Sequence, residues 1–260
     1  RDWSVTGVQT CALPISMTTI GQPRLTHLEH ADRYGYYVQR GLISAEHLAR
    51  IREAFARLQR EVKPEWDKPF QTYYPNVIEF DDAFADLIDH PGILEGVFQI
   101  VGQEAQIYSN EILVSKPNQG TMAWHRDKMS IGRHCPNQFL KLAIFLDHVA
   151  VDGGPTGVIP ESHFDIYKGE EFYPHKIDFT AGPGDVLAFG AATLHRAGFH
   201  SPNRPNRPVI FLTYIPWWMK QPDYYTGRTC EKLLKSASPL RRQLLGAQLR
   251  PGVSLDSFST

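Results

Sequence analysis

The sequence has few cysteines, almost no net charge and no long apolar run, and each of these absences excludes a class of protein. Its three cysteines, Cys11, Cys135 and Cys230, form no CxxC pair, which excludes a disulfide framework and a cysteine zinc site. This cysteine usage favours a reducing, cytoplasmic location. The 27 basic and 28 acidic residues leave a net charge of −1, so charge predicts neither a nucleic-acid nor a membrane partner. No apolar stretch approaches the roughly 18–20 residues that span a bilayer.

The first sixteen residues, RDWSVTGVQTCALPIS, differ in character from the rest of the chain. They resemble the translation of a sequencing-adapter oligonucleotide, so we expect the natural chain to begin at Met17 and leave residues 1–16 out of the fold prediction. The alternative is a genuine N-terminal arm. Residues 17–260 are expected to form a single domain, because hydrophobic content is 42% and no repeat or linker interrupts the chain.

The spacing of apolar residues predicts helices first, a β-rich core next and a helical C-terminus last. The most regular helix is expected over residues 45–62, after Ser44 at the N-cap. Short β-rich runs separated by Gly, Pro, Asn and Asp begin near residue 106 and predict a sandwich or barrel. Further helices are expected over 25–34, 82–88, 92–101 and 229–249, strands over 35–40, 107–116, 141–146, 158–159, 177–179, 185–189 and 209–216, and irregular structure over 68–80.

The segment Trp124-His125-Arg126-Asp127 carries the main candidate metal ligands. Side chains alternate along an extended strand, so His125 and Asp127 point to the same side. A second histidine from a distant strand, His195, would complete a set of two histidines and one carboxylate with open coordination positions. That set suits non-haem Fe(II) that must also bind a co-substrate and O2. The alternatives are a surface histidine, a turn carboxylate and a hydrogen-bonded core histidine.

A second His-x-Asp motif, His163-Phe164-Asp165, competes with the first. His163 closes a turn rich in Gly and Pro (residues 152–157), whereas His125 follows an expected strand and turn. His195 lies 70 residues after His125 but 32 after His163, and only the longer separation leaves room for several intervening strands. His195 also follows its own turn and buried strand, Gly182-Pro183-Gly184-Asp185-Val186-Leu187-Ala188-Phe189. We therefore predict that His125, Asp127 and His195 are the ligands and that His163 is structural.

An arginine lies at the start of the last expected strand, about a dozen residues after His195. The planar guanidinium of Arg207 can bind a carboxylate through two parallel hydrogen bonds, which a lysine cannot do. Such a group suits the distal end of a dicarboxylate co-substrate that chelates the iron. Arg204 is the second candidate, and the alternative for both residues is a solvated loop charge.

Taken in order, these motifs resemble the phytanoyl-CoA dioxygenase family of Fe(II)/2-oxoglutarate-dependent oxygenases. The resemblance covers most of residues 33–214 and is carried by the Trp124–Asp127 segment, by Gly153-Gly154-Pro155-Thr156-Gly157-Val158-Ile159-Pro160-Glu161-Ser162-His163, and by Gly182–Asp185, His195 and Arg207. It implies a mainly β fold with flanking helices, whose core is a double-stranded β-helix, or cupin-like jelly roll. It further implies that His125, Asp127 and His195 bind Fe(II), that Arg207 or Arg204 binds 2-oxoglutarate, and that O2 is consumed.

The resemblance also implies an activity, namely hydroxylation of an unactivated C–H bond in a small molecule with release of succinate and CO2. Ala197 departs from the family pattern, which often places a small hydroxyl residue shortly after the distal histidine to help hold 2-oxoglutarate. Trp124, Lys128 and Trp217 are predicted to line the substrate pocket, together with Met129, Trp218 and Tyr73, although they could equally fill the core or cover the rim. Desaturation, epimerisation or ring formation at the same iron, and a jelly-roll binding protein without catalysis, remain alternatives.

Overall fold

The computed structural model describes residues 25–127, 139–219 and 231–247. The first sixteen residues and Lys128, about which the sequence makes predictions, lie outside these ranges. Within them, no helix is both long and apolar enough to cross a membrane.

Helices begin where the sequence provides capping groups. The Ser44 hydroxyl accepts a hydrogen bond from the His47 amide and caps the long helix, whose residues Leu48, Ile51, Ala54 and Leu58 are buried at helical spacing. Thr26 and Glu29 form a reciprocal capping box at the first helix. The helices are α1 (His27–Tyr34), α2 (Ala45–Glu61), α3 (Asp82–Ala85), α4 (Pro91–Ile100), α5 (Glu231–Ser236) and α6 (Pro239–Leu244).

The strands form two antiparallel sheets. The large sheet has the order β1-β8-β5-β10-β4-β3-β2, and the small sheet has the order β7-β6-β9. Many neighbours in these sheets, such as β1 and β8 or β4 and β10, are distant in sequence, as in a jelly roll. The strands are β1 (Tyr36–Gln39), β2 (Trp66–Asp67), β3 (Gln71–Pro75), β4 (Ala105–Ser115), β5 (Leu140–Phe145), β6 (Thr156–Val158), β7 (Ile177–Phe179), β8 (Val186–Gly190), β9 (His195–Ala197) and β10 (Arg207–Pro216).

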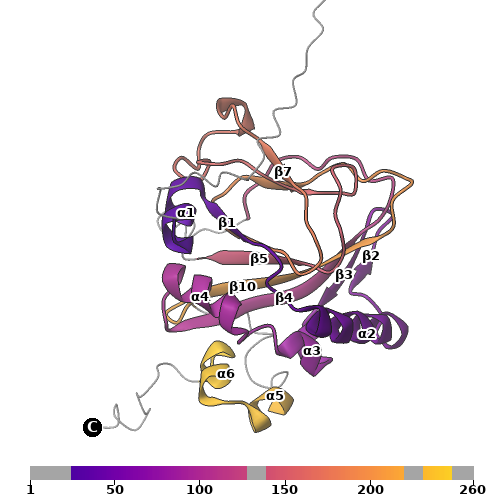
Figure 1. Ribbon diagram of the computed structural model, residues 1–260, viewed down its shortest axis with the longest axis vertical. Coiled ribbons are helices and arrows are strands. Elements are labelled where there is room, and N and C mark those ends of the chain that lie inside the picture. Colours follow the sequence, from indigo (N-terminus) through magenta and orange to yellow (C-terminus); the bar gives the residue numbers. More distant parts are fainter. Residues whose placement is uncertain (1–24, 128–138, 220–230, 248–260) are drawn as a thin grey trace, which may run out of the picture.

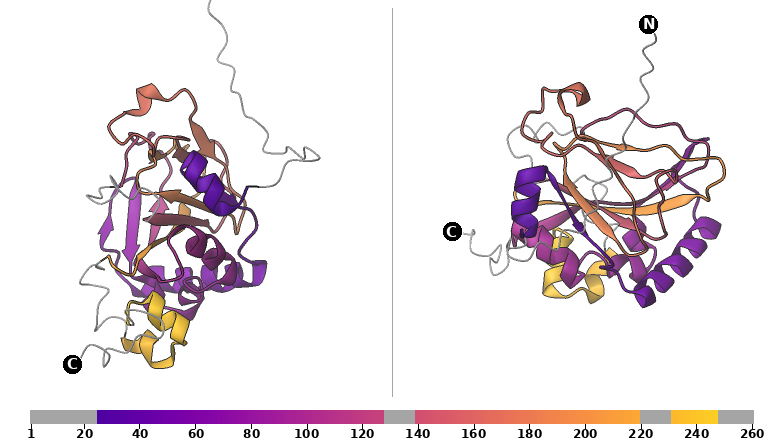
Figure 2. Two further views of the ribbon diagram at one scale, coloured as in Figure 1. Left: turned by 90° about the vertical axis from the view of Figure 1, so that its left-hand side faces the viewer. Right: turned by 45° about the horizontal axis from the view of Figure 1, so that its top comes forward.

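The large sheet separates two environments. Helices α2, α3 and α4 cover one side of it, and the small sheet faces its other side (Figures 1 and 2). Alternate residues of β4 show the division, because Ile112 and Val114 belong to the core beneath the helices, whereas Glu111 and Leu113 line a cavity on the opposite side. A second apolar cluster, which includes Phe145, Phe179 and Phe189, fills part of the space between the sheets.

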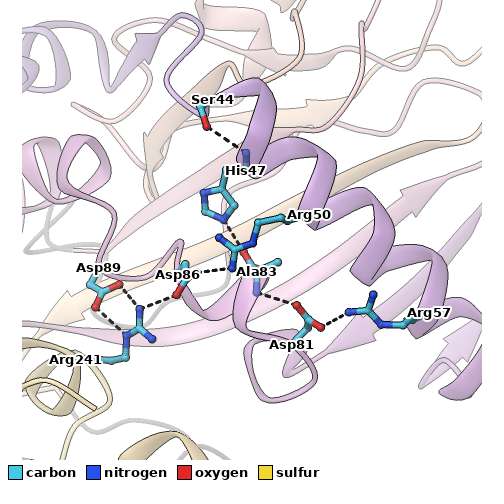
Figure 3. A network of polar contacts seen from close by, with 9 residues as sticks. All are labelled: Ser44, His47, Arg50, Arg57, Asp81, Ala83, Asp86, Asp89 and Arg241. Carbon is cyan, nitrogen blue, oxygen red and sulfur yellow. Dashed lines mark hydrogen bonds and ion pairs between the residues drawn. The ribbon is translucent and has the colours of Figure 1, made fainter. Parts of the chain in front are cut away.

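A network of ion pairs joins helix α6 to the rest of the protein (Figure 3). The Arg241 guanidinium of α6 donates to both oxygens of Asp89, at 2.8 and 2.7 Å, and to Asp86 at 3.1 Å. Arg50 of α2 donates to the other Asp86 oxygen at 2.7 Å. The Asp86 carboxylate therefore links the first long helix to the last helix.

The predicted mainly β fold with flanking helices and a double-stranded β-helix core is confirmed. Three strands, β2, β3 and β9, were not predicted. Residues 71–75 were expected to be irregular, yet β3 pairs with β4 from Gln71↔Ser115 to Pro75↔Glu111. Strand β9 has only three residues and carries His195, Arg196 and Ala197. Strands β2 and β9 have only two and three residues, too few to show an alternating pattern, so tertiary pairing decides them.

Candidate metal centre

The two predicted histidine ligands lie on chain segments that pair directly. His125 and His195 form an isolated antiparallel bridge in which each amide donates to the other residue's carbonyl, at 3.0 and 2.9 Å. Their imidazole ring centroids are 4.4 Å apart. The pairing brings together residues that are 70 positions apart in the sequence and leaves Asp127 on the same side as His125.

The side chains of His125, Asp127 and His195 each direct one potential metal-ligand atom to the same point. The Nδ1 atoms of His125 and His195 lie 3.2 and 3.0 Å from the carbonyl oxygens of Ala123 and Thr193. A carbonyl only accepts, so each Nδ1 carries a proton, which leaves Nε2 as the atom of each ring that can bind a metal. His195 Nε2 is 3.5 Å from Asp127 Oδ1, and one ligand atom from each of the three residues lies within 4.8 Å of the others. Lone pairs this close to a carboxylate repel unless a cation lies between them, so the donor set fits a divalent metal.

The electrostatics also favour the ligand forms. Burial and the neighbouring His195 lower the pKa of His125, which keeps its imidazole neutral. Burial opposes the charge on Asp127, but the close approach of His195 and the charge of Lys141 hold the pKa of this carboxyl well below its usual range. Lys141 Nζ lies 3.4 Å from Asp127 Oδ2, which leaves Oδ1 facing the histidines. Deprotonated ligands are what a metal site requires.

Among the residues that the structure describes, Arg207 is a buried cation without a carboxylate partner. Its side chain lies at the start of β10, the residue is 7% exposed, and Nη2 donates to Ser115 Oγ at 2.7 Å. Within the described chain, Nε and Nη1 have no hydrogen-bond partner. Burial lowers the pKa of Arg207 to about 10, so the group stays charged at neutral pH. A buried charge of this kind requires an anion, and the distal carboxylate of a dicarboxylate fits it.

A cavity of about 250 Å³ connects Arg207 to the three metal-ligand candidates. Apolar and aromatic side chains form much of its wall, as is usual in ligand pockets. It is lined by Trp66, Gln71, Tyr73, Glu111, Leu113, Met122, His125, Asp127, Lys141, Thr156, Phe189, His195, Arg196, Ala197, Arg207 and Phe211.

Of the remaining predicted site residues, Tyr73 lines this cavity, and Arg204, Trp124 and Trp217 do not. Arg204 is an exposed loop residue whose Nε donates to Asp152 at 2.9 Å. Trp124 points to the opposite side of the segment from His125. The guanidinium carbon of Arg196 stacks over the Trp124 ring, 4.2 Å from the ring centroid. Trp217 borders a separate hollow with Val101 and Pro216. Since neither tryptophan lines the cavity, their contact with substrate stays a prediction, and Lys128 lies outside the described residues.

The second His-x-Asp motif lies elsewhere. His163 is buried, and its Nε2 is 2.9 Å from the carbonyl oxygen of Asp32 in α1. Asp165 Oδ1 accepts the Tyr167 amide at 3.0 Å and stabilises a turn. The two side chains therefore serve the packing of this loop, as the sequence predicted for His163.

Sequence reasoning did not identify several polar residues of the cavity. Glu111 and Lys141 occupy positions on β4 and β5 where a strand pattern alone predicts only burial. Thr156 lies directly opposite Ala197 in the small sheet and brings a hydroxyl to the cavity wall where Ala197 has none. In the sequence, only the presence of charged residues within otherwise apolar strands indicated that these side chains line a cavity.

The chain belongs to the phytanoyl-CoA dioxygenase family, whose model matches residues 31–207, more than half of the sequence. A probable alpha-ketoglutarate-dependent hypophosphite dioxygenase from Stutzerimonas stutzeri is 24% identical over 153 residues, which are 52% of this chain. The matched region spans 51%, or about half, of that relative's length.

Solved structures share the fold. The epimerase SnoN, in complex with Fe3+, alpha ketoglutarate and nogalamycin RO, superposes with a TM-score of 0.63 at 20% identity over 82% of this chain and 89% of its own. The carbocyclase SnoK gives 0.64 at 18% identity over 83% and 94%. HygX from Streptomyces hygroscopicus, with nickel, 2-oxoglutarate and hygromycin B bound, gives 0.60 at 16% identity over 74% and 86%.

Proposed function

We propose that this protein is an Fe(II)/2-oxoglutarate-dependent oxygenase that hydroxylates a C–H bond of a small molecule. The observation that carries the proposal is the presence, in one cavity, of a set of two histidines and one carboxylate and of a buried arginine that has no carboxylate partner among the described residues. Family membership supports it independently. His125, Asp127 and His195 would hold Fe(II), and Arg207 rather than Arg204 would hold the distal carboxylate of 2-oxoglutarate.

The protein's own residues bind, orient and exclude water. When bound, iron and 2-oxoglutarate supply the oxidising chemistry, with O2 as the oxidant and succinate and CO2 as co-products. Arg207 and the Ser115 hydroxyl fix one end of the diacid deep in the cavity. Lys141 forms an ion pair with Asp127 Oδ2 and so orients this carboxylate. The ring centroid of Phe189 lies 4.6 Å from that of His195, and this packing limits rotation of the imidazole. The apolar walls at Leu113 and Phe211 keep bulk water from the reacting centre.

The test is the visible charge-transfer band that Fe(II) gives when 2-oxoglutarate chelates it in the absence of O2. We expect the wild-type protein to show this band and Asp127→Ala to lose it while keeping its circular dichroism spectrum. Asp165→Ala removes the carboxylate of the second His-x-Asp motif and should keep the band. A folded wild-type protein without the band, or an Asp127→Ala variant that retains it, contradicts the proposal.

Epimerisation or ring closure is the second candidate, favoured by the shared fold with an epimerase and a carbocyclase. The same ligands and arginine would serve either outcome, since the position of the substrate decides which reaction follows. Mass spectrometry of the product separates them, because hydroxylation adds one oxygen atom and epimerisation leaves the mass unchanged. A binding protein without catalysis would release no succinate with any substrate.

A further inference from the structure

Glu111 is a buried carboxyl group that the proposed chemistry does not use. It lies in the middle of β4, is 8% exposed and lines the cavity. The Ser109 hydroxyl bonds this carboxyl, but within the described chain nothing donates to its Oε2 atom. A buried acceptor without a donor costs free energy, so its retention in a cavity wall suggests a ligand that supplies the donor.

The position of Glu111 separates it from the 2-oxoglutarate end of the cavity. Ser115, the partner of Arg207, lies four residues further along the same face of β4, about 13 Å away at about 3.3 Å per residue. Glu111 instead lies within electrostatic range of Lys141 and Asp127, next to the metal ligands. Across the sheet it pairs with Phe211, whose side chain also lines the cavity. A group bound at Glu111 would therefore lie on the substrate side of the metal.

The other charged groups of the cavity already have partners or assigned ligands. Arg196 donates to both oxygens of Asp178 at 3.3 Å, and Lys141 contacts Asp127. Arg207 is assigned to 2-oxoglutarate and Asp127 to the metal. Among the charged groups of the cavity, Glu111 therefore has an oxygen, Oε2, that no group of the described chain contacts by a hydrogen bond and that a substrate could use.

We propose that Glu111 binds the substrate through an O–H or N–H donor, so that the oxidised carbon lies close to a hydroxyl or amine group. This inference rests on the proposed function and adds a substrate class to it, namely polyhydroxylated or amino compounds rather than plain hydrocarbon chains. Leu113 and Phe211, on either side of Glu111 in the cavity wall, would pack against the carbon skeleton. The carboxyl then sets which part of the substrate faces the metal.

The experiment measures binding directly on protein loaded with Zn(II) and 2-oxoglutarate and labelled with 13C at the glutamate carboxyls. The Glu111 signal is identified by its loss in Glu111→Gln. Four small probes are titrated: methylammonium has charge and an N–H donor, glycerol has O–H donors, tetramethylammonium has charge without a donor, and dimethyl sulfoxide only accepts. We expect a saturable shift with methylammonium, glycerol or both, and none with the other two.

Glu111→Gln should weaken binding of the responding probe at least tenfold, since the amide nitrogen that replaces one carboxyl oxygen cannot accept a hydrogen bond. This variant lacks the Glu111 signal, so its affinity is measured by calorimetric titration with the same probe. Glu53→Gln, a surface change on α2, should leave binding of the probe unaltered. Glu111→Asp keeps a carboxyl group but withdraws it from the cavity, and it should weaken binding of the probe as well. A response to methylammonium alone assigns an amine substrate, and a response to glycerol assigns a hydroxyl. No saturable response to either donor, or an equal response to tetramethylammonium or dimethyl sulfoxide, overturns the inference. Failure of the proposed function would show separately, as a missing charge-transfer band with Fe(II).

Discussion

Arg126 Nε donates a 2.7 Å hydrogen bond to the carbonyl oxygen of Ala192, and this bond joins the two chain segments that carry the metal-ligand candidates. Arg126 stands between His125 and Asp127, and Ala192 precedes His195 by three residues. The remaining guanidinium nitrogens donate to carbonyls of the adjoining loop, at Ser162 (2.8 Å), Asp165 (3.1 Å) and Lys168 (3.1 Å). One side chain thus fixes both sides of the site from outside the cavity.

Arg126→Lys should weaken metal binding while the protein stays folded. Lysine cannot reproduce the planar fork that serves four carbonyls, so the ligand segments would lose their fixed spacing. We expect Zn(II) affinity, measured by calorimetric titration well below the melting temperature, to fall about tenfold, as is common when supporting contacts of a metal site are removed.

Arg52→Lys on α2 is the matched control for Arg126→Lys and should bind Zn(II) like the wild type. If Arg126→Lys lowers only the melting temperature and leaves the affinity unchanged, Arg126 supports the fold and does not position the ligands.

Arg207→Lys should raise the concentration of 2-oxoglutarate needed for half-maximal charge-transfer absorbance by tenfold or more. The lysine ammonium keeps the charge but cannot form two parallel hydrogen bonds with a carboxylate. Arg204→Lys is the matched control, since its side chain is exposed and paired with Asp152. A larger effect at Arg204 than at Arg207 would reverse the assignment.

The sequence predicted that His125, Asp127 and His195 lie together, but it did not predict strands β2, β3 and β9. His125, Asp127 and His195 could be singled out because metal ligands require particular residue types, and because two alternating positions on one segment restrict the geometry. Their convergence depends on an isolated bridge between His125 and His195, which no local pattern encodes. Glu111 was missed for a related reason, because one charged residue in a buried strand indicates a cavity only after the neighbouring strands are placed.

Arg241→Ala should lower the free energy of unfolding by about 2 kcal/mol, the scale of charge-assisted hydrogen bonds between partly buried groups. The substitution leaves Asp89 without its two-point partner and loosens the contact of α6 with the rest of the protein (Figure 3). Urea unfolding at constant protein concentration measures the change. Arg242→Ala, the next residue of α6, is the control and should change stability by less than a third as much.

The same network predicts loss of stability in acid. Burial opposes the charge of Asp86, but hydrogen bonds from Arg50 and Arg241 hold the pKa of this carboxyl below its ordinary value of 3.8. A carboxyl with a lowered pKa in the folded state stabilises the protein above its unfolded pKa, and this contribution disappears as pH falls through the folded pKa. The charged and titratable groups around it are Arg50, Arg241, Asp89, Glu46, His47 and His90.

Urea unfolding between pH 5 and pH 2.5 checks this acid dependence. We expect the wild-type protein to lose more stability than Arg241→Ala below about pH 4, the range in which an Asp with a lowered pKa gains its proton. Equal slopes for the two proteins would mean that Arg241 does not stabilise the ionised form of Asp86.

Because His125 pairs with His195, the site depends strongly on the number of residues in the segment that leads to His125. Removing a single residue between Met122 and His125 would turn Trp124 and Arg126 toward the cavity and the two ligands away from it, because side chains alternate along an extended segment. The sheets and the helical layer would remain intact, since the bridge lies outside their regular ladders. Descendants of such a chain could retain the architecture of an oxygenase after losing its chemistry, so overall resemblance alone does not reveal which relatives are still enzymes.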